Sequence, residues 1–320
     1  MEQRQVGRTG LRVSALGLGT MTWGRGTDAD TAAALLLQFV DAGGTLLDTC
    51  AAYDSEALLG TLLGTTVDRS DVVLATRAGF RRTRGGPVVD TSRATLLSTL
   101  DISLARLGTD HVDLWLVQSP DPRTPAEETA SALRAAVSSG RARYVGLANH
   151  PGWATARTAG LLGTDPALAA VEVEYSLLQR GVEREVVPAA AALGAGVVAW
   201  SPLGRGVLTG KYRRGVPVSS RAASDDLAGF VEPYLGPGSS AVVDAVVTAA
   251  AGLEREPAQV AAAWVLGRPQ VAAALVGART PDQLRGCLGA TDLRLPDEIA
   301  AALDEVTAPR LGYPERLGGD

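Results

Sequence analysis

Short runs of apolar residues alternate with longer stretches of helical periodicity along almost the whole chain. These runs are continuous rather than alternating, which is typical of parallel strands buried on both faces. Eight strand–helix units over this length favour an α/β fold of the (β/α)8, or TIM barrel, type over a doubly wound sheet. The predicted strands cover residues 13–19, 45–47, 71–76, 111–117, 143–147, 169–174, 196–200 and 272–276.

Helical stretches connect the predicted strands, and we expect a single barrel domain over residues 1–320. Asp28 or Asp30 can cap the first helix. The predicted helices cover residues 31–41, 55–63, 95–106, 125–139, 153–162, 182–193, 240–253, 257–266, 281–288 and 296–303. Three segments lack such periodicity: a polar, glycine-rich loop at 80–90, a long irregular insertion at 204–238 and a polar tail at 309–320.

Polar residues follow several of these strands at the point where the apolar run stops. Asp48, Arg77, Gln118, Asn149 and Ser201 each do so, whereas Glu172 lies inside a run. In a barrel of parallel strands these positions line one mouth, where the active site of such a fold lies. A structural alternative exists for each of them, because polar residues also cap strands and helices.

The segment around Asp48 carries the most specific chemical pattern. A carboxylate at the end of a buried strand has to be paired or used in chemistry. Tyr53 follows five residues later and is a candidate proton donor, provided that a cation lowers its pKa. The structural alternative is that Asp48 caps the helix starting near Ser55 and that Tyr53 is a packing residue.

Composition narrows the class of protein without naming a substrate. The chain has 320 residues, a net charge of −5 and interspersed charges, so neither nucleic acid nor a membrane surface is an expected partner. Met1–Gln5 is polar and unlike a signal peptide, which favours a cytoplasmic protein. Two histidines, His111 and His150, make a multi-histidine metal site unexpected, and we expect no bound metal.

Several longer motifs occur in order along the chain. They include Val6-Gly7-Arg8-Thr9-Gly10-Leu11, Gly17-Leu18-Gly19-Thr20, Asp48-Thr49 with Tyr53, Gly146-Leu147-Ala148-Asn149, Glu174 to Arg180, Ser201-Pro202-Leu203 with Gly206 to Tyr212, and Val276-Gly277-Ala278-Arg279 with Gln283. In these motifs the chain resembles the aldo-keto reductase family over almost its whole length. The resemblance implies the barrel fold and NADPH-dependent reduction of a carbonyl, with the cofactor extended across the barrel mouth.

The same resemblance implies a catalytic group of four residues, two of which depart from the family pattern. Tyr53 and Asp48 match the family's tyrosine acid and its aspartate. Arg77 stands where the family has lysine, and Gln118 stands where it has histidine. A guanidinium keeps the positive charge but is planar and forked, so it could pair with Asp48 through both nitrogens and withdraw from Tyr53. Gln118 can donate a hydrogen bond but cannot relay a proton.

The cofactor side is also predicted from the resemblance. Trp200 would stack on the nicotinamide, Asn149 would hold its carboxamide, and Glu172 would help where the family usually has glutamine. Ser201, Leu203 and Arg205 would line the pyrophosphate. Lys211, Arg221 and Arg279 are cations for phosphates, including the 2′-phosphate that distinguishes NADPH from NADH. Gly277 belongs to the motif before Arg279, Gln283 matches an adenosine contact, and Gly286 and Cys287 replace the usual Glu-Asn pair.

Three functions remain open at this stage. The first is an NADPH-dependent oxidoreductase acting on a carbonyl or related C=X bond of a small molecule, with slow turnover of ordinary aldehydes. The second is a nicotinamide-binding sensor or scaffold, since the potassium-channel β subunits of this family tolerate an amide at the histidine position. The third is a non-redox enzyme that performs dehydration or cyclisation. Residues that could wall a substrate pocket are Met21, Trp23, Phe80, Trp153 and Tyr234, although core or loop packing is the more common fate of such side chains. The tail 311–320 is a possible cover, and His150 is a possible substitute acid. The substrate, the direction of reaction and the oligomeric state are left open.

Overall fold

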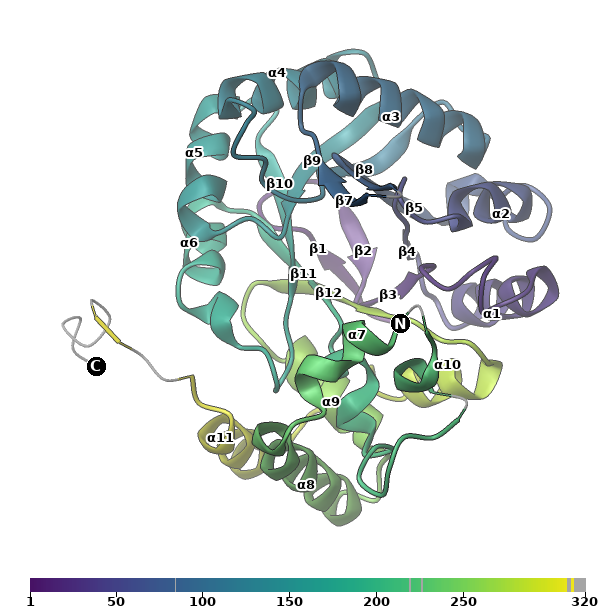
Figure 1. Cartoon of the computed structure of the whole chain (residues 1–320), viewed down its shortest axis with the longest axis vertical. Helices are drawn as coiled ribbons and strands as arrows, with labels where there is room; N and C mark the ends of the chain where they lie inside the picture. Colours follow the sequence, from purple (N-terminus) through teal and green to yellow (C-terminus); the bar gives the residue numbers. More distant parts are fainter. Residues whose placement is uncertain (84, 219, 226, 310–311, 314–320) are drawn as a thin grey trace.

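Eight parallel strands close into a barrel in the computed structural model, which describes residues 1–83, 85–218, 220–225, 227–309 and 312–313. The closed order is β10-β11-β12-β3-β4-β5-β8-β9, with β9 paired again to β10 (Figure 1). The predicted (β/α)8 barrel is therefore confirmed. Its strands are β3 (Leu16–Gly19), β4 (Leu46–Asp48), β5 (Val73–Ala78), β8 (Val112–Val117), β9 (Ala142–Ala148), β10 (Leu168–Glu174), β11 (Gly196–Trp200) and β12 (Val271–Val276).

Helices surround the barrel, and a continuous apolar layer lies between them and the strands. Asp28 caps the first helix, where its carboxylate accepts a hydrogen bond from the Thr31 N–H at 2.8 Å. The helices are α1 (Ala29–Asp41), α2 (Ser55–Leu62), α3 (Arg93–Leu107), α4 (Ala126–Ser138), α5 (Gly152–Leu162), α6 (Val186–Leu193), α7 (Ala228–Val231), α8 (Pro237–Gly252), α9 (Pro257–Leu266), α10 (Pro281–Leu288) and α11 (Asp297–Val306). None of the helices in the described part of the chain combines the length and apolar character needed to cross a bilayer.

The first predicted strand, 13–19, is in fact two strands separated by a bend. β1 (Gln3–Gln5) and β2 (Arg12–Ser14) form an antiparallel hairpin, and β3 begins two residues later. Ser14 fixes the bend, because its hydroxyl donates to the Leu16 carbonyl at 2.6 Å and accepts from the Thr45 N–H at 2.8 Å. Side chains of this segment pack against the barrel interior, so the hairpin closes the end opposite the mouth.

Two further segments are more ordered than the sequence pattern predicts. The loop 80–90 contains a second hairpin, β6 (Phe80–Thr83) with β7 (Gly86–Val89). The insertion 204–238 contains α7 and the short 3₁₀ helices η3 (Gly204–Thr209), η4 (Arg221–Ala223) and η5 (Glu232–Tyr234). Two more 3₁₀ helices are η1 (Arg69–Asp71) and η2 (Gly181–Glu183). The predicted helix 182–193 is therefore divided between η2 and α6. These elements are too short to show a hydrophobic period.

Gly60 sets how closely α2, the helix that follows Tyr53, approaches α3. A Cβ at Gly60 would lie 2.1 Å from the Arg106 carbonyl oxygen, whereas one at Gly160 in α5 would meet nothing within 4 Å. We expect Gly60→Ala to lower the free energy of unfolding by about 1–3 kcal/mol, because a backbone atom cannot give way cheaply. Gly160→Ala should instead raise it by about 0.5–1 kcal/mol through helix propensity. Urea unfolding of both variants checks this, and equal effects would contradict the close approach.

Candidate active site

The four candidate catalytic side chains meet at the carboxyl-terminal mouth of the barrel. Asp48 ends β4, Arg77 lies near the end of β5, and Gln118 directly follows β8. Tyr53 lies in the turn before α2, where its N–H donates to the Cys50 carbonyl at 2.8 Å. All four line one cavity of about 620 Å³. The structure thus brings together residues that lie up to 70 positions apart, from Asp48 to Gln118.

Arg77 is the centre of this cluster. Its Nη2 donates to Asp48 Oδ2 at 2.9 Å and to the Tyr53 hydroxyl at 3.3 Å. Its Nη1 forms an ion pair with Glu172 Oε1, which reaches it from β10. Arg77, Asp48 and Glu172 are 4%, 3% and 1% exposed. One guanidinium therefore contacts two buried carboxylates and the candidate acid.

The contacts of Asp48 exclude two of the arrangements that its sequence position allowed. Asp48 does not cap α2, whose N-cap residue is Asp54. Arg77 does not pair with Asp48 through both terminal nitrogens either, because one of them contacts Glu172. The guanidinium consequently stays within reach of the Tyr53 hydroxyl.

The electrostatics follow from burying three charges together. Burial raises the pKa of Asp48 to about 6, although the positive charge of Arg77 opposes this rise. Burial is the largest single influence on Arg77 and opposes its charge, but Asp48, Tyr53 and Cys50 together outweigh it, and the pKa of the guanidinium rises above its ordinary value. Arg77 therefore stays charged, whereas Asp48 is the member of the pair that takes up a proton at mildly acidic pH.

Cys50 and Gln118 complete the catalytic end of the cavity. The Cys50 thiol lies 3.7 Å from the Arg77 carbonyl oxygen and 3.8 Å from Gln118 Oε1. Burial raises the pKa of this thiol, so it is a neutral thiol rather than a thiolate at neutral pH. The backbone carbonyl of Gln118 accepts a hydrogen bond from Asn149 Nδ2 at 2.9 Å. This bond joins the ends of β8 and β9.

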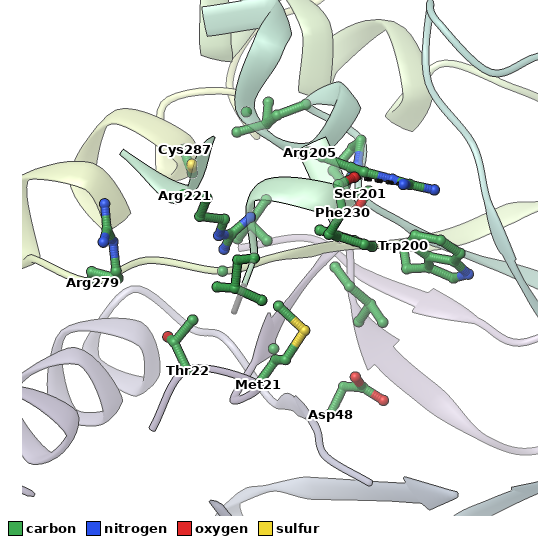
Figure 2. Close-up of a pocket in the computed structure, with 18 of the residues that line it drawn as sticks. Met21, Thr22, Asp48, Trp200, Ser201, Arg205, Arg221, Phe230, Arg279 and Cys287 are labelled. Atoms are coloured by element: carbon green, nitrogen blue, oxygen red, sulfur yellow. Dashed lines mark hydrogen bonds between the residues drawn. The ribbon is translucent and has the colours of Figure 1, made fainter. Parts of the chain in front are cut away.

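Trp200 forms the aromatic wall of the cavity. Its indole N–H donates to Asn149 Oδ1 at 2.9 Å. Its ring lies 6.4 Å from the Phe230 ring at an interplanar angle of 21°. Figure 2 shows the two rings beside each other. Asn149 and the next residue after Trp200, Ser201, both have positive φ, at 57° and 53°. Non-glycine residues in this region are strained and cluster at functional sites. The strain here turns the ends of β9 and β11 into the cavity.

Arg205 lies beside Trp200 and is neutralised by a carboxylate. Its Nε and Nη2 donate to the two oxygens of Glu174 at 2.8 and 2.6 Å, and Nη1 donates to the Phe230 carbonyl. The guanidinium also lies 4.2 Å from the centroid of the Phe230 ring. Arg205 lines the cavity, as does Leu203, but its guanidinium is held by Glu174 rather than directed to an anion.

A cationic group lies at the other side of the cavity. Lys211, Arg221 and Arg279 all line it, and Figure 2 shows Arg221 and Arg279 across from Trp200 and Phe230. Burial and then the charges of the two arginines lower the pKa of Lys211, and burial and Arg279 lower the pKa of Arg221. Three cations that repel one another at a partly buried site suit a bound anion such as a phosphate.

Gln283 and Gly277 belong to the same side of the cavity. Gln283 Oε1 accepts a hydrogen bond from the Arg279 N–H at 2.9 Å. Arg221 passes over Gly277, since a Cβ there would lie 3.2 Å from its Nη2. A Cβ at Gly286 would lie 2.7 Å from Glu256 Oε2, so a glutamate from the start of α9 fills the space next to this glycine.

Two of the five residues considered as pocket walls line the cavity, and the other three do not. Met21 and Phe80 line the cavity, but Trp23 is fully buried in the core and Trp153 is 65% exposed. Tyr234 is buried against Arg205, with 4.9 Å between the guanidinium and its ring. Loop residues carry no periodicity, and so their side-chain directions could not be deduced from the sequence. The tail 311–320 lies almost entirely outside the described residues.

His150 and Glu172 also differ from their predicted surroundings. His150 is buried, its Nδ1 lies 2.8 Å from the Ala148 carbonyl oxygen, and burial lowers its pKa. It does not line the cavity and is poorly placed to act as a substitute acid. Glu172 lies beneath the cavity against Arg77, not on its lining.

Several residues of the cavity wall were not predicted from the sequence. Among them are Leu227, Phe230 and Glu256. The first two lie in the insertion 204–238, where isolated apolar residues among polar ones were the available signal. Within the described residues, no three His, Cys, Asp or Glu side chains are grouped as a metal site requires.

Comparison with known proteins places these observations in a family. The sequence model of the Aldo/keto reductase family matches residues 15–308. The chain is 35% identical to a Bacillus subtilis protein named uncharacterized oxidoreductase YrpG, over 96% of both chains. It is 32% identical to a probable voltage-gated potassium channel subunit beta of Oryza sativa, over 99% of this chain and 98% of the relative. It is also 32% identical to L-glyceraldehyde 3-phosphate reductase of Escherichia coli O157:H7, over 95% and 92%. The chain belongs to the aldo/keto reductase family.

Proposed function

We propose that this protein is an NADPH-dependent oxidoreductase that reduces a carbonyl or related C=X bond of a small organic substrate. The observation that carries the proposal is the 3.3 Å contact between the Tyr53 hydroxyl and Arg77 Nη2 at the wall of the cavity. A phenol next to a fixed cation can give up a proton more readily than one in water. Relatives named as a reductase and an oxidoreductase support the same class of reaction.

The cavity suits a phosphorylated nicotinamide dinucleotide. Lys211, Arg221 and Arg279 would hold its phosphates, and Trp200 offers a flat ring for the nicotinamide. Asn149 could hold the carboxamide, although in this structure its amide bonds to Trp200 and Gln118. Such a cofactor, in its reduced form, would supply the hydride that reduction of the substrate carbon needs.

The protein's own residues supply the proton and the orientation. Tyr53 donates its hydroxyl proton to the substrate oxygen, and Arg77 stabilises the phenolate that remains. The Gln118 amide donates a hydrogen bond that orients the carbonyl. Because an amide cannot relay protons, Tyr53 carries the acid role alone and solvent must reprotonate it.

A second candidate function is a nicotinamide-binding sensor with little turnover. The observation that favours it is the replacement of the family's lysine and histidine by Arg77 and Gln118, together with the relative named as a potassium channel subunit beta. The third function, non-redox acid–base chemistry, requires only Tyr53 and the buried charges. Activity in the absence of a nicotinamide would distinguish it.

A fluorescence titration with NADPH and NADH tests the proposal. We expect saturable quenching of tryptophan fluorescence by NADPH, and a Kd for NADPH raised about ten-fold or more in Lys211→Met, because a charge-assisted bond to phosphate is worth about 1.5–3 kcal/mol. The Kd for NADH should rise by a similar factor if Lys211 holds the pyrophosphate, which both cofactors carry, and much less if it holds the 2′-phosphate. Turnover of a panel of aldehydes and ketones then separates a reductase from a sensor. Absence of binding to either cofactor would overturn both of these readings.

A further inference from the structure

Two carboxylates compete for one guanidinium at the base of the cavity. Glu172 and Asp48 come from β10 and β4, on opposite sides of Arg77, and each takes a different terminal nitrogen. The contact with Glu172 leaves Nη2 as the nitrogen shared by Asp48 and the Tyr53 hydroxyl. Side-chain exposures of 1–5% for the three residues place the whole group out of water.

We infer that Glu172 is a positioning residue for proton transfer: it fixes the Arg77 guanidinium so that Nη2 faces Tyr53, and its charge keeps the Tyr53 phenol protonated. This inference deepens the proposed function and rests on it for the role of Tyr53. It replaces the predicted role of Glu172 as a contact to the cofactor, since Glu172 does not line the cavity.

The charge balance gives the physical reason. Asp48, Arg77 and Glu172 sum to −1 when all are ionised, whereas one carboxylate with one cation sums to zero. A nearby negative charge disfavours the phenolate, so Glu172 offsets part of the effect of Arg77 on Tyr53. The other ionisable groups near this region are the Cys50 thiol, Glu56 of α2 and, from η4, Arg221. None of them pairs with Glu172 in the described structure, and Glu56 is held by Thr76 and Arg106.

The consequence concerns the direction of the reaction. Reduction of a carbonyl needs the phenol as proton donor, whereas oxidation of an alcohol needs the phenolate as base. A site that keeps the phenol protonated can reduce carbonyls up to a higher pH. We therefore expect a site biased toward carbonyl reduction.

The test is the substitution Glu172→Gln, which keeps an oxygen acceptor for Arg77 but removes the charge. We expect the pKa of Tyr53 to fall by about one unit. NMR of protein labelled at the tyrosine ring carbon next to the hydroxyl measures this pKa, with Tyr53→Phe assigning the signal. The alkaline limb of kcat for NADPH-dependent reduction of 4-nitrobenzaldehyde should move to lower pH by the same amount, with the Kd of NADPH unchanged.

A control and a rescue separate this role from a merely structural one. Glu174→Gln removes a glutamate two positions along the same strand that pairs with Arg205, and it should leave the pKa of Tyr53 unchanged. Arg77→Lys places the family's lysine beside Glu172, where the family usually has glutamine, and should lower kcat, because a single ammonium cannot hold both Asp48 and Glu172. Adding Glu172→Gln to Arg77→Lys should recover about ten-fold of that loss, as expected for residues in direct contact.

The outcomes are distinguishable from failure of the proposed function. An unchanged Tyr53 pKa in Glu172→Gln would overturn the inference, whether or not the protein reduces aldehydes. A raised Kd for NADPH with an unchanged Tyr53 pKa would assign Glu172 to the cofactor instead. A lowered pKa in a protein that turns over no carbonyl would support the inference about Glu172 and count against the reductase.

Discussion

Tyr53→Phe is expected to lower kcat for carbonyl reduction by about 10²- to 10⁴-fold, the usual contribution of a positioned general acid. The substitution removes only the hydroxyl that lies 3.3 Å from Arg77 Nη2. The ring remains in the turn before α2, so the walls of the cavity and the cationic group across it are preserved. The Kd of NADPH should therefore stay close to that of the unmodified protein. Steady-state kinetics on an aldehyde and the fluorescence titration measure the two quantities.

Tyr144→Phe is the matched control for this prediction. Tyr144 lies in β9, and its hydroxyl approaches Gly10 in the turn of the amino-terminal hairpin, at the end of the barrel opposite the mouth. Its loss should leave kcat unchanged. If Tyr53→Phe kept most of its activity, the proton would have to come from water or another group. The proposed acid would then be wrong, even if hydride transfer takes place.

The sequence predicted the barrel because its signal is repeated eight times. Each strand is a short apolar run, and the polar residue that stops the run marks the carboxyl end, as at Asp48, Arg77 and Gln118. Parallel strands put these ends at one mouth, so the site could be located without knowing the order of the strands. Both hairpins were missed for the opposite reason, since strands such as β1 (Gln-Arg-Gln) and β6 (Phe-Arg-Arg-Thr) are mostly polar and form no apolar run.

The ion pair between Arg77 and Glu172 could not be predicted from the sequence. The two residues are 95 positions apart, and β5 and β10 are not neighbours in the closed strand order. Glu172 lies inside its apolar run, where the pattern does not show whether the side chain points into the barrel or toward the helices. The contact depends on the register of β10 against β9 and β11, which only the structure supplies.

Arg77→Met should have the largest effect on stability. It removes the only charge-compensating partner that the described structure gives Glu172, and with it the partner of Asp48, at sites that are 1–5% exposed. Breaking a buried ion pair from one side leaves uncompensated charge and typically lowers the free energy of unfolding by about 3–5 kcal/mol. Arg157→Met is the control, since Arg157 pairs with Glu127 at 3.1 Å with both side chains more than half exposed, and its loss should change stability by less than about 1 kcal/mol.

The cause of this loss is testable through charge and pH. If unpaired carboxylates are responsible, adding Asp48→Asn and Glu172→Gln to Arg77→Met should recover most of the lost stability.

Burial already raises the pKa of Asp48 to about 6 with Arg77 present, and removing Arg77 should raise it further. In the variant, the folded state then binds more protons than the unfolded state above pH 4, so its stability falls as pH rises toward neutrality. The deficit relative to the unmodified protein, measured by urea unfolding, should be smaller at pH 5 than at pH 8. A deficit that is equal at both pH values and is not reduced in the triple variant would mean that Arg77 stabilises the barrel by packing rather than by charge.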